Sequence, residues 1–157
     1  MTEQKTLIIY TDGSSRGNPG RGGYGVVMLW GNNRKELSQG FKLTTNNRME
    51  LMGVIVALES LKTNDIPLTI YTDSKYIVDT VQKRWLDTWI KTDFKGGKKN
   101  KDLWTRYYKL SRSLKITFVW VKGHADNPHN NRCDELATCA ADGGNLIVDI
   151  GYEGVNS

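Results

Sequence analysis

The first third of the chain carries its hydrophobic residues in short runs separated by polar turns. Residues 5–11, 24–30 and 35–43 are rich in aliphatic and aromatic side chains, and the segments between them are dense in Gly, Asn and Pro. Runs of this kind, bounded by turn residues, are typical of strands. The pattern therefore predicts three strands joined by short turns, which is an antiparallel meander.

Helical spacing replaces this pattern in the next segment. Residues 45–47 (Thr-Asn-Asn) are good cap residues, and hydrophobic side chains then recur every three or four positions over 49–61, which predicts a buried helix. The rest of the chain predicts strands at 68–72 and 115–121, and helices from Ser74 towards Val81, at 103–114 and at 131–141. This order of elements belongs to the α/β class, with a mixed sheet covered by helices.

Length and composition limit the class of protein. The 157 residues suit one domain spanning 1–157, and the 38% of hydrophobic residues supply one core. The longest apolar run, 24–30, is far shorter than the roughly 20 residues that cross a membrane, and the N-terminal residues do not resemble a signal segment. Because two cysteines cannot form a disulfide framework, we expect a soluble, cytoplasmic protein. We expect the tail, residues 143–157, to be partly loose.

The positive charge is concentrated in one segment. The chain has 22 Lys and Arg against 17 Asp and Glu, a net charge of +5. Most of this excess lies between residues 91 and 101, where one acid, Asp93, accompanies Lys91, Lys95, Lys98, Lys99 and Lys101. With aromatic residues nearby, the segment is either a solvated loop beside core tryptophans or a basic handle, residues 83–101. We favour the handle, because lysines follow phosphates and aromatic rings stack on bases.

Four carboxylates fall at the ends of predicted elements. Asp12 and Asp73 follow the first and fourth strands, and Glu50 and Asp134 lie in the first turns of helices. Each has an ordinary local explanation as a turn residue, an N-cap or a first-turn acid, and Asn47 with Glu50 matches a capping box. However, ligand sites of α/β sheets gather at the carboxyl ends of strands, and converging carboxylates need cations. Mg²⁺ or Mn²⁺ would suit them, and two such ions are suited to displacement at a phosphodiester.

Three other signals were weighed. His124 follows the last predicted strand and is either an exposed loop side chain or a mobile proton shuttle. Residues 20–25 match G-x-G-x-x-G but lead into a strand, whereas the dinucleotide motif precedes a helix, so we reject a nucleotide site. The two histidines and two cysteines lack the spacing of a zinc site.

Six motifs occur in order along the chain. They are Tyr10–Ser14, Gly17–Gly25, Thr45–Leu51, Tyr71–Ser74, Trp120–His124 and Asn130–Ala137. From about residue 5 to residue 142 the chain closely resembles bacterial ribonuclease H of type 1. The resemblance implies the ribonuclease H-like fold, a five-stranded mixed sheet of three antiparallel strands and then parallel strands, with helices on both faces. It also implies endonucleolytic hydrolysis of the RNA strand in RNA–DNA hybrids by two metal ions, leaving 5′-phosphate and 3′-hydroxyl ends.

The resemblance assigns roles to individual residues. The residues that match the metal-binding, catalytic carboxylates are Asp12, Glu50, Asp73 and Asp134, with His124 as the mobile catalytic histidine. Those that match substrate-binding positions are Gly13, Asn18, Thr45, Asn46, Asn47, Lys75, Trp85, Lys91, Lys95, Lys98 and Lys99. In the family the asparagines face the minor groove, the threonine lies near a DNA-phosphate pocket, and the handle grips the DNA strand. The implied partner is the RNA–DNA hybrid, bound by a monomer without a membrane.

The chain also departs from the family pattern. Asn131 stands where many relatives have Glu, which puts the metal dependence in question, and Lys75 replaces a commoner Gln beside Asp73. Gly96 and Gly97 would make the handle more flexible, and we expect distributive action. Two alternatives stay open. An integrase-type nuclease would share the fold but act on DNA, and an inactive hybrid-binding module would have no need of four carboxylates.

Overall fold

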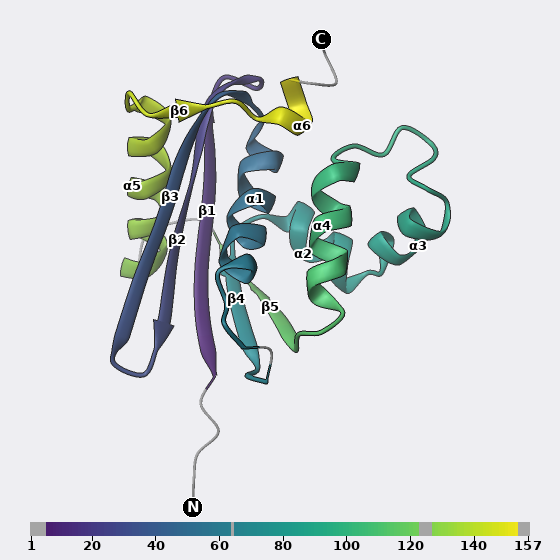
Figure 1. Cartoon of the computed structure of the whole chain (residues 1–157), viewed down its shortest axis with the longest axis horizontal. Coiled ribbons are helices and arrows are strands. Elements are labelled where there is room, and N and C mark those ends of the chain that lie inside the picture. The colour runs from purple at the N-terminus through teal and green to yellow at the C-terminus, as the bar shows by residue number, and fades with distance from the viewer. Residues whose placement is uncertain (1–5, 64, 123–126, 154–157) are drawn as a thin grey trace, which may run out of the picture.

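The computed structural model describes residues 6–63, 65–122 and 127–153. The elements within these ranges are β1 (Leu7–Arg16), β2 (Gly20–Trp30), β3 (Asn33–Thr44), α1 (Asn46–Glu59), β4 (Leu68–Thr72), α2 (Lys75–Gln82), α3 (Trp85–Lys91), α4 (Lys101–Ser111), β5 (Ile116–Trp120), α5 (Pro128–Asp142), β6 (Leu146–Ile147) and α6 (Ile150–Glu153). Figure 1 shows α5 on one face of the sheet and α1, α2 and α4 on the other. None of the helices in the described ranges is long and apolar enough to span a bilayer.

The strands form one mixed sheet in the order β5-β4-β1-β2-β3-β6. The first three strands are antiparallel, whereas β4, β5 and β6 each join their neighbours in parallel. The predicted α/β class, with a mixed sheet between helices, is therefore confirmed. The sheet has six strands rather than the five predicted, because Leu146 and Ile147 pair with Gly40 and Phe41 at its edge.

Several predicted boundaries were wrong in an instructive way. The segment 12–20 was expected to be a turn, but β1 continues to Arg16 because its last residues pair with the glycine-rich start of β2. The G-x-G-x-x-G segment lies inside β2, which confirms that it does not begin a helix. The last long helix begins at Pro128, three residues earlier than predicted, because the Asn127 side chain caps it and proline suits the first helical turn.

The main core lies between the sheet and α1. Residues on nearly every side of α1 are buried, because β1 and β2 cover one side of the helix and α4 covers another. Fully buried aliphatic side chains such as Leu51, Val54 and Ile55 fill this layer. On the other face, α5 lies against β1, β2 and β3 and contributes small buried residues, among them Ala137 and Ala141. The helices thus fix both faces of β1, the strand that carries Asp12.

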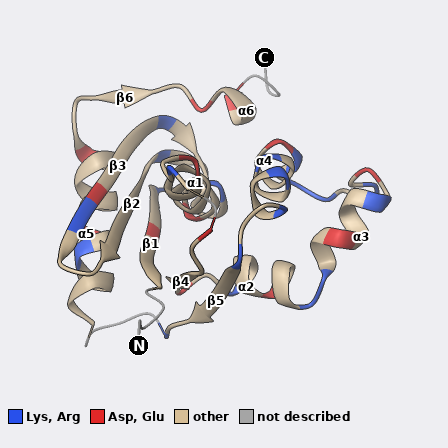
Figure 2. Ribbon diagram, turned by 60° about the horizontal axis from the view of Figure 1, so that its bottom comes forward, with Lys and Arg blue, Asp and Glu red and all other residues tan. Residues whose placement is uncertain are grey.

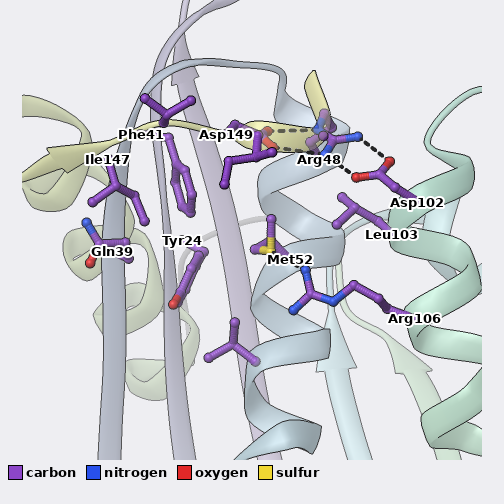
Figure 3. Close-up of a pocket in the computed structure, with 14 residues that line it drawn as sticks. Tyr24, Gln39, Phe41, Arg48, Met52, Asp102, Leu103, Arg106, Ile147 and Asp149 are labelled. Carbon is purple, nitrogen blue, oxygen red and sulfur yellow. Dashed lines mark hydrogen bonds and ion pairs between the residues drawn. The ribbon is translucent and has the colours of Figure 1, made fainter. Parts of the chain in front are cut away.

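The chain after α5 returns across the edge of the sheet to α1. Asp149 is only 1% exposed; its carboxylate accepts hydrogen bonds from Thr44 Oγ1 at 2.7 Å and from Arg48 Nε and Nη2 at 2.8 and 2.9 Å. Arg48 also donates to Asp102, the second residue of α4. Figure 3 shows Arg48, Asp102 and Asp149, which help to line a pocket of about 350 Å³ together with residues such as Tyr24 and Met52. One buried guanidinium therefore joins α1, α4 and the C-terminal segment.

Candidate active site

Three carboxylates from separate elements meet at one end of the sheet. Carboxylate oxygens of Asp12, Glu50 and Asp73 lie within 4.8 Å of one another. The parallel register of β1 and β4 pairs Tyr10 with Tyr71, so the residues two positions further on, Asp12 and Asp73, reach the same edge. Glu50 comes from α1, which packs on β1. The grouping inferred from strand ends is therefore present for these three residues.

A glycine allows α1 to come this close to β1. A Cβ atom at Gly13 would lie 2.3 Å from the main-chain nitrogen of Glu50 and 2.5 Å from the carbonyl carbon of Met49. Such distances are far inside van der Waals contact, so only glycine fits without moving the helix. Gly13, predicted as a substrate-binding position, is thus the residue that lets Asp12 and Glu50 face each other.

Asp134 approaches the same site from the other face. It lines a cavity of about 490 Å³ together with Asp12, Glu50 and Asp73, although it is not part of the three-carboxylate group within 4.8 Å. Helix α5 reaches the sheet over Gly25, where a Cβ atom would lie 2.2 Å from the carbonyl oxygen of Cys133. The exposed Asp134 side chain therefore stands at the rim of the cavity.

The local explanations considered for these acids do not hold in the structure. The N-cap of α2 is Ser74, whose hydroxyl accepts from the Ile77 amide, and not Asp73. The N-cap of α1 is Thr45, so the predicted capping box of Asn47 with Glu50 is wrong. Because α1 and α5 begin earlier than expected, neither Glu50 nor Asp134 lies in a first turn. The carboxylates are thus placed by the fold without serving the helix ends.

The cluster is electrostatically strained in the absence of a cation. Burial, followed by the nearby negative charge of Asp73, raises the pKa of Asp12 from 3.8 to about 7. Burial, followed by the charges of Asp12 and Asp73, raises the pKa of Glu50 well above its ordinary value. Oε2 of Glu50 is buried and has no hydrogen-bond partner among the described residues. A buried, unsatisfied carboxylate oxygen beside two other acids fits a hard cation with oxygen ligands.

The predicted substrate-binding asparagines border this cavity. Asn46 and Asn47 line it, and Asn18 is tied to them because its side-chain oxygen accepts a hydrogen bond from the Asn46 amide at 3.2 Å. The Asn46 side chain in turn accepts from Ser15 Oγ at 2.9 Å. Thr45 accepts from the Arg48 amide, which fixes the first turn of α1. Exposed amide groups from two elements therefore form one surface beside the carboxylates.

The basic handle is anchored by its aromatic residues. Trp104 is fully buried and Phe94 is 7% exposed, and the ring of Trp89 contacts both. These rings therefore belong to the core and not, as considered from the sequence, to a stacking surface. Trp85 differs, because its ring is 42% exposed. In Figure 2 basic residues gather along α3 and the loop to α4, where the structure places Lys91, Lys95, Lys98, Lys99 and Lys101.

The handle loop has a defined backbone. Gly96 and Gly97 have φ angles of +85° and +78°, which glycine adopts without strain, and Lys101 closes the loop through an ion pair with Asp93 at 2.7 Å. The loop borders a cavity of about 920 Å³ whose lining includes Lys98, Lys99 and Lys101. A row of ammonium groups along an open cavity suits the phosphates of a nucleic-acid strand.

Some site residues lie beyond the described chain or escaped the sequence analysis. His124 lies outside the described residues. Lys75, in contrast, lines the carboxylate cavity as predicted. The lining also includes Ser14, Ser74 and Tyr76, none of which the sequence analysis singled out. Their signal was adjacency in the chain, because each lies within three residues of Asp12 or Asp73.

The free cysteines take no part in this site. Cys133 is buried beneath α5, where its thiol donates to the Tyr10 carbonyl oxygen at 3.2 Å, and Cys139 is exposed. Burial raises the pKa of the Cys133 thiol to about 12, so it stays protonated and unreactive at neutral pH.

Comparisons with known proteins agree with this arrangement. The model of the RNase H family matches residues 4–142. The chain is similar to a Ribonuclease H of Trichodesmium erythraeum, with 51% identity over 98% of this chain and 100% of that protein. A Ribonuclease H of Syntrophus aciditrophicus is 50% identical over 95% of this chain and 88% of the relative.

Solved structures give the same result. The chain is similar to LC9-RNase H1, described as a type 1 RNase H with the type 2 active-site motif. The TM-score is 0.78 at 29% identity, over 100% of this chain and 83% of the other. It is also similar to LC11-RNase H1, which was solved in complex with an RNA/DNA hybrid. There the TM-score is 0.68 at 30% identity, over 87% of this chain and 96% of the other. Together with the family match over residues 4–142, these likenesses show that the chain belongs to the RNase H family.

Proposed function

We propose that Asp12, Glu50 and Asp73, with Asp134 beside them, hold the divalent ions with which this ribonuclease H hydrolyses the RNA strand of RNA–DNA hybrids. The observation that carries the proposal is the convergence of three carboxylates within 4.8 Å, one of them with a buried oxygen that lacks a partner. Mg²⁺ is the ion we expect, with Mn²⁺ as a substitute, because both prefer carboxylate and water oxygens.

The carboxylates have separate tasks in this proposal. Asp12 interacts with both other acids, because the charge of Asp73 raises the pKa of Asp12 and the charge of Asp12 raises the pKa of Glu50. Asp12 would therefore help to hold the ions together with each of these two carboxylates. Asp134, exposed at the rim of the cavity, is suited to complete the second ion site from α5. When bound, such a pair of ions activates a water molecule and stabilises the leaving 3′-oxygen.

Substrate choice would come from the surfaces beside the cluster. The exposed amides of Asn18, Asn46 and Asn47 can donate to and accept from 2′-hydroxyl groups, which line the wide, shallow minor groove of a hybrid and distinguish RNA from DNA. In this proposal Thr45 and the handle lysines bind the backbone of the DNA strand. His124 stays a prediction as the proton shuttle that assists product release.

Cleavage assays with matched duplexes test the function. End-labelled RNA–DNA hybrid, RNA–RNA duplex and DNA–DNA duplex are each incubated with Mg²⁺, with Mn²⁺ or with a chelator. We expect cleavage of the RNA strand of the hybrid alone, with 5′-phosphate ends and no product in the chelator. Cleavage of DNA–DNA duplex instead would favour the integrase-type alternative.

Variants assign the residues. Asp12→Asn should abolish cleavage while hybrid binding, measured by fluorescence anisotropy, survives. The control is Asp65→Asn, an exposed carboxyl in the loop before β4, which should cleave like the original chain. A chain that binds hybrid but never cleaves it with either ion would be a binding module, and the catalytic proposal would be wrong.

The remaining expectations concern state and location. We propose that the chain acts as a monomer in the cytoplasm, where two free cysteines are expected to stay reduced. Light scattering on the purified chain with and without hybrid measures the oligomeric state. A dimer in the presence of hybrid would contradict the monomeric model.

A further inference from the structure

Trp120 is a large exposed side chain beside the catalytic cluster. It ends β5, where it pairs with Thr72 of β4, and 41% of its surface is exposed. The core does not explain its presence, because the neighbouring hydrophobic cluster is formed by other residues. Trp120 begins one of the six sequence motifs, and the sequence alone assigns it no role.

The indole of Trp120 is bonded to the main chain of Asp73. Its Nε1 donates to the Asp73 carbonyl oxygen at 3.2 Å. Asp73 stands between the end of β4 and the N-cap Ser74, so its own peptide lies outside both the strand ladder and the helix. The Ser74 amide donates to Thr72 Oγ1 at 3.1 Å, and the Val121 amide donates to the Thr72 carbonyl at 2.9 Å. These bonds hold the junction from which the Asp73 carboxylate enters the cluster.

The ring of Trp120 also contacts the Lys75 ammonium. Lys75 Nζ lies 4.7 Å from the ring centroid, which is within the range of a cation–π contact. Lys75 is exposed, is the first residue of α2, and lines the same cavity as Asp12 and Asp73. Within the part of the chain that the structure describes, its ammonium forms no ion pair with a carboxylate. The ring therefore holds a positive charge at the wall of the cavity that the carboxylates line.

We propose that Trp120 is a positioning residue with two roles. Its N–H fixes the Asp73 main chain, and its ring orients Lys75 towards an RNA phosphate next to the cleaved bond. The inference rests on the proposed function of the cavity. It assigns to Lys75 a contact with a charged phosphate. An ammonium on a flexible stem can leave the ring face for a phosphate as the hybrid binds.

Two substitutions separate these actions. Trp120→Phe keeps a ring for Lys75 but removes the N–H donor. We expect kcat to fall about fivefold, the loss associated with one hydrogen bond, and the Mg²⁺ concentration at half-maximal rate to rise. Lys75→Met removes the charge and keeps the length of the side chain. We expect KM to rise severalfold and the slope of log(kcat/KM) against log[salt] to become shallower by about 0.7–0.9, which is one phosphate contact.

Trp120→Ala should lower kcat, as Trp120→Phe does, and should also raise KM, as Lys75→Met does. In the double variant that combines Trp120→Ala with Lys75→Met, KM should be no higher than in either single variant. The control is Arg112→Met. Arg112 is exposed and lies 5.8 Å from the ring centroid of Tyr108, a second cation–π pair on α4 that the cavity does not include. Its kinetics should equal those of the original chain.

The Mg²⁺ midpoint, the salt slope and the melting temperature together distinguish a positioning role of Trp120 from a role in stability alone. A structural role for Trp120 would lower the melting temperature but leave the Mg²⁺ midpoint and the salt slope of the folded enzyme unchanged, and that result would overturn the inference. A raised KM in Lys75→Met with an unchanged salt slope would overturn the phosphate contact. If the original chain fails to cleave hybrid at all, the proposed function itself is wrong. If it cleaves and Trp120→Phe and Lys75→Met behave identically to it, only this inference is wrong.

Discussion

Removal of the Asp12 charge should stabilise the metal-free protein. The pKa of Asp12 rises from 3.8 to about 7 on folding, chiefly through burial and the neighbouring Asp73. Between about pH 4 and pH 7, Asp12 is therefore protonated in the folded state but ionised in the unfolded state. Because the native state binds more protons in this window, the free energy of unfolding falls as pH rises through it. Below pH 4 the group is protonated in both states and the penalty disappears.

The size of the effect follows from the same linkage. Each pKa unit corresponds to about 1.4 kcal/mol, so a rise of about three units carries up to about 4 kcal/mol at pH 8. Asp12→Asn removes the charge but keeps an oxygen that can accept the hydrogen bond from the Gly13 amide, 2.9 Å long in the structure. The stability gained is smaller than this upper value, because Glu50 and Asp73 still repel each other after the Asp12 charge is removed. We therefore expect Asp12→Asn to be more stable than the original chain by about 2–4 kcal/mol at pH 8 and by almost nothing at pH 4.

Urea unfolding followed by circular dichroism, in a chelator, measures this difference at both pH values. Adding Mg²⁺ should narrow the gap, because an ion that binds only the folded original chain stabilises it, by about 2.7 kcal/mol at one hundred times its dissociation constant. Asp65→Asn, whose carboxyl is exposed, should change neither profile. Equal stability of Asp12→Asn and the original chain at pH 8 would refute the claim that the cluster is strained. A gain that is the same at pH 4 would assign it to something other than this charge.

Two further substitutions test how the fold supports the site. Gly13→Ala places a methyl group where the Glu50 main-chain nitrogen lies 2.3 Å away, so we expect a loss of about 1–3 kcal/mol in unfolding free energy. We also expect Gly13→Ala to bind Mg²⁺ more weakly, as measured by titration calorimetry. If the variant keeps the stability and the Mg²⁺ affinity of the original chain, α1 can shift to admit the methyl group and our account of Gly13 is wrong. Asp149→Ala removes a carboxylate from the buried guanidinium of Arg48, and should cost about 3 kcal/mol in urea unfolding. The same change at Asp142, whose ion pair is exposed, should leave stability unchanged, and equal losses at both positions would contradict this account.

The sequence predicted which carboxylates gather but not why they can. The order of strands and helices was enough to place Asp12 and Asp73 at one edge, because parallel neighbours end together. The closeness of the helices depends instead on residues without side chains. Gly13 admits α1 and Gly25 admits α5, and the sequence alone did not show that Gly25 serves a helix contact, although it belongs to one of the six motifs. A pattern of glycines in a strand indicates a close approach only once the partner helix is known.

Long-range pairing also lay beyond local patterns. Leu146 and Ile147 are too short a run to predict a strand, and they form one because β3 offers an open edge beside them. Asp149 looks like any acid in a polar tail, yet it is buried against Arg48, which lies 101 positions earlier in the chain. Neither the β6 pairing nor the burial of Asp149 can be predicted from neighbouring residues in the chain, because each depends on a partner that only the tertiary fold brings close.

The two kinds of carboxylate in this protein make the physical distinction clear. Asp149 is almost fully buried but receives hydrogen bonds from Thr44 and Arg48, so the fold supplies what its charge needs. Glu50 is buried with an oxygen that the fold leaves without a donor, next to two more acids that raise its pKa. A protein selected for stability alone would satisfy or remove that oxygen. The fold instead keeps this deficit in the cavity where we propose that a divalent cation and the phosphodiester bind, and under that proposal the cation supplies what the Glu50 oxygen lacks.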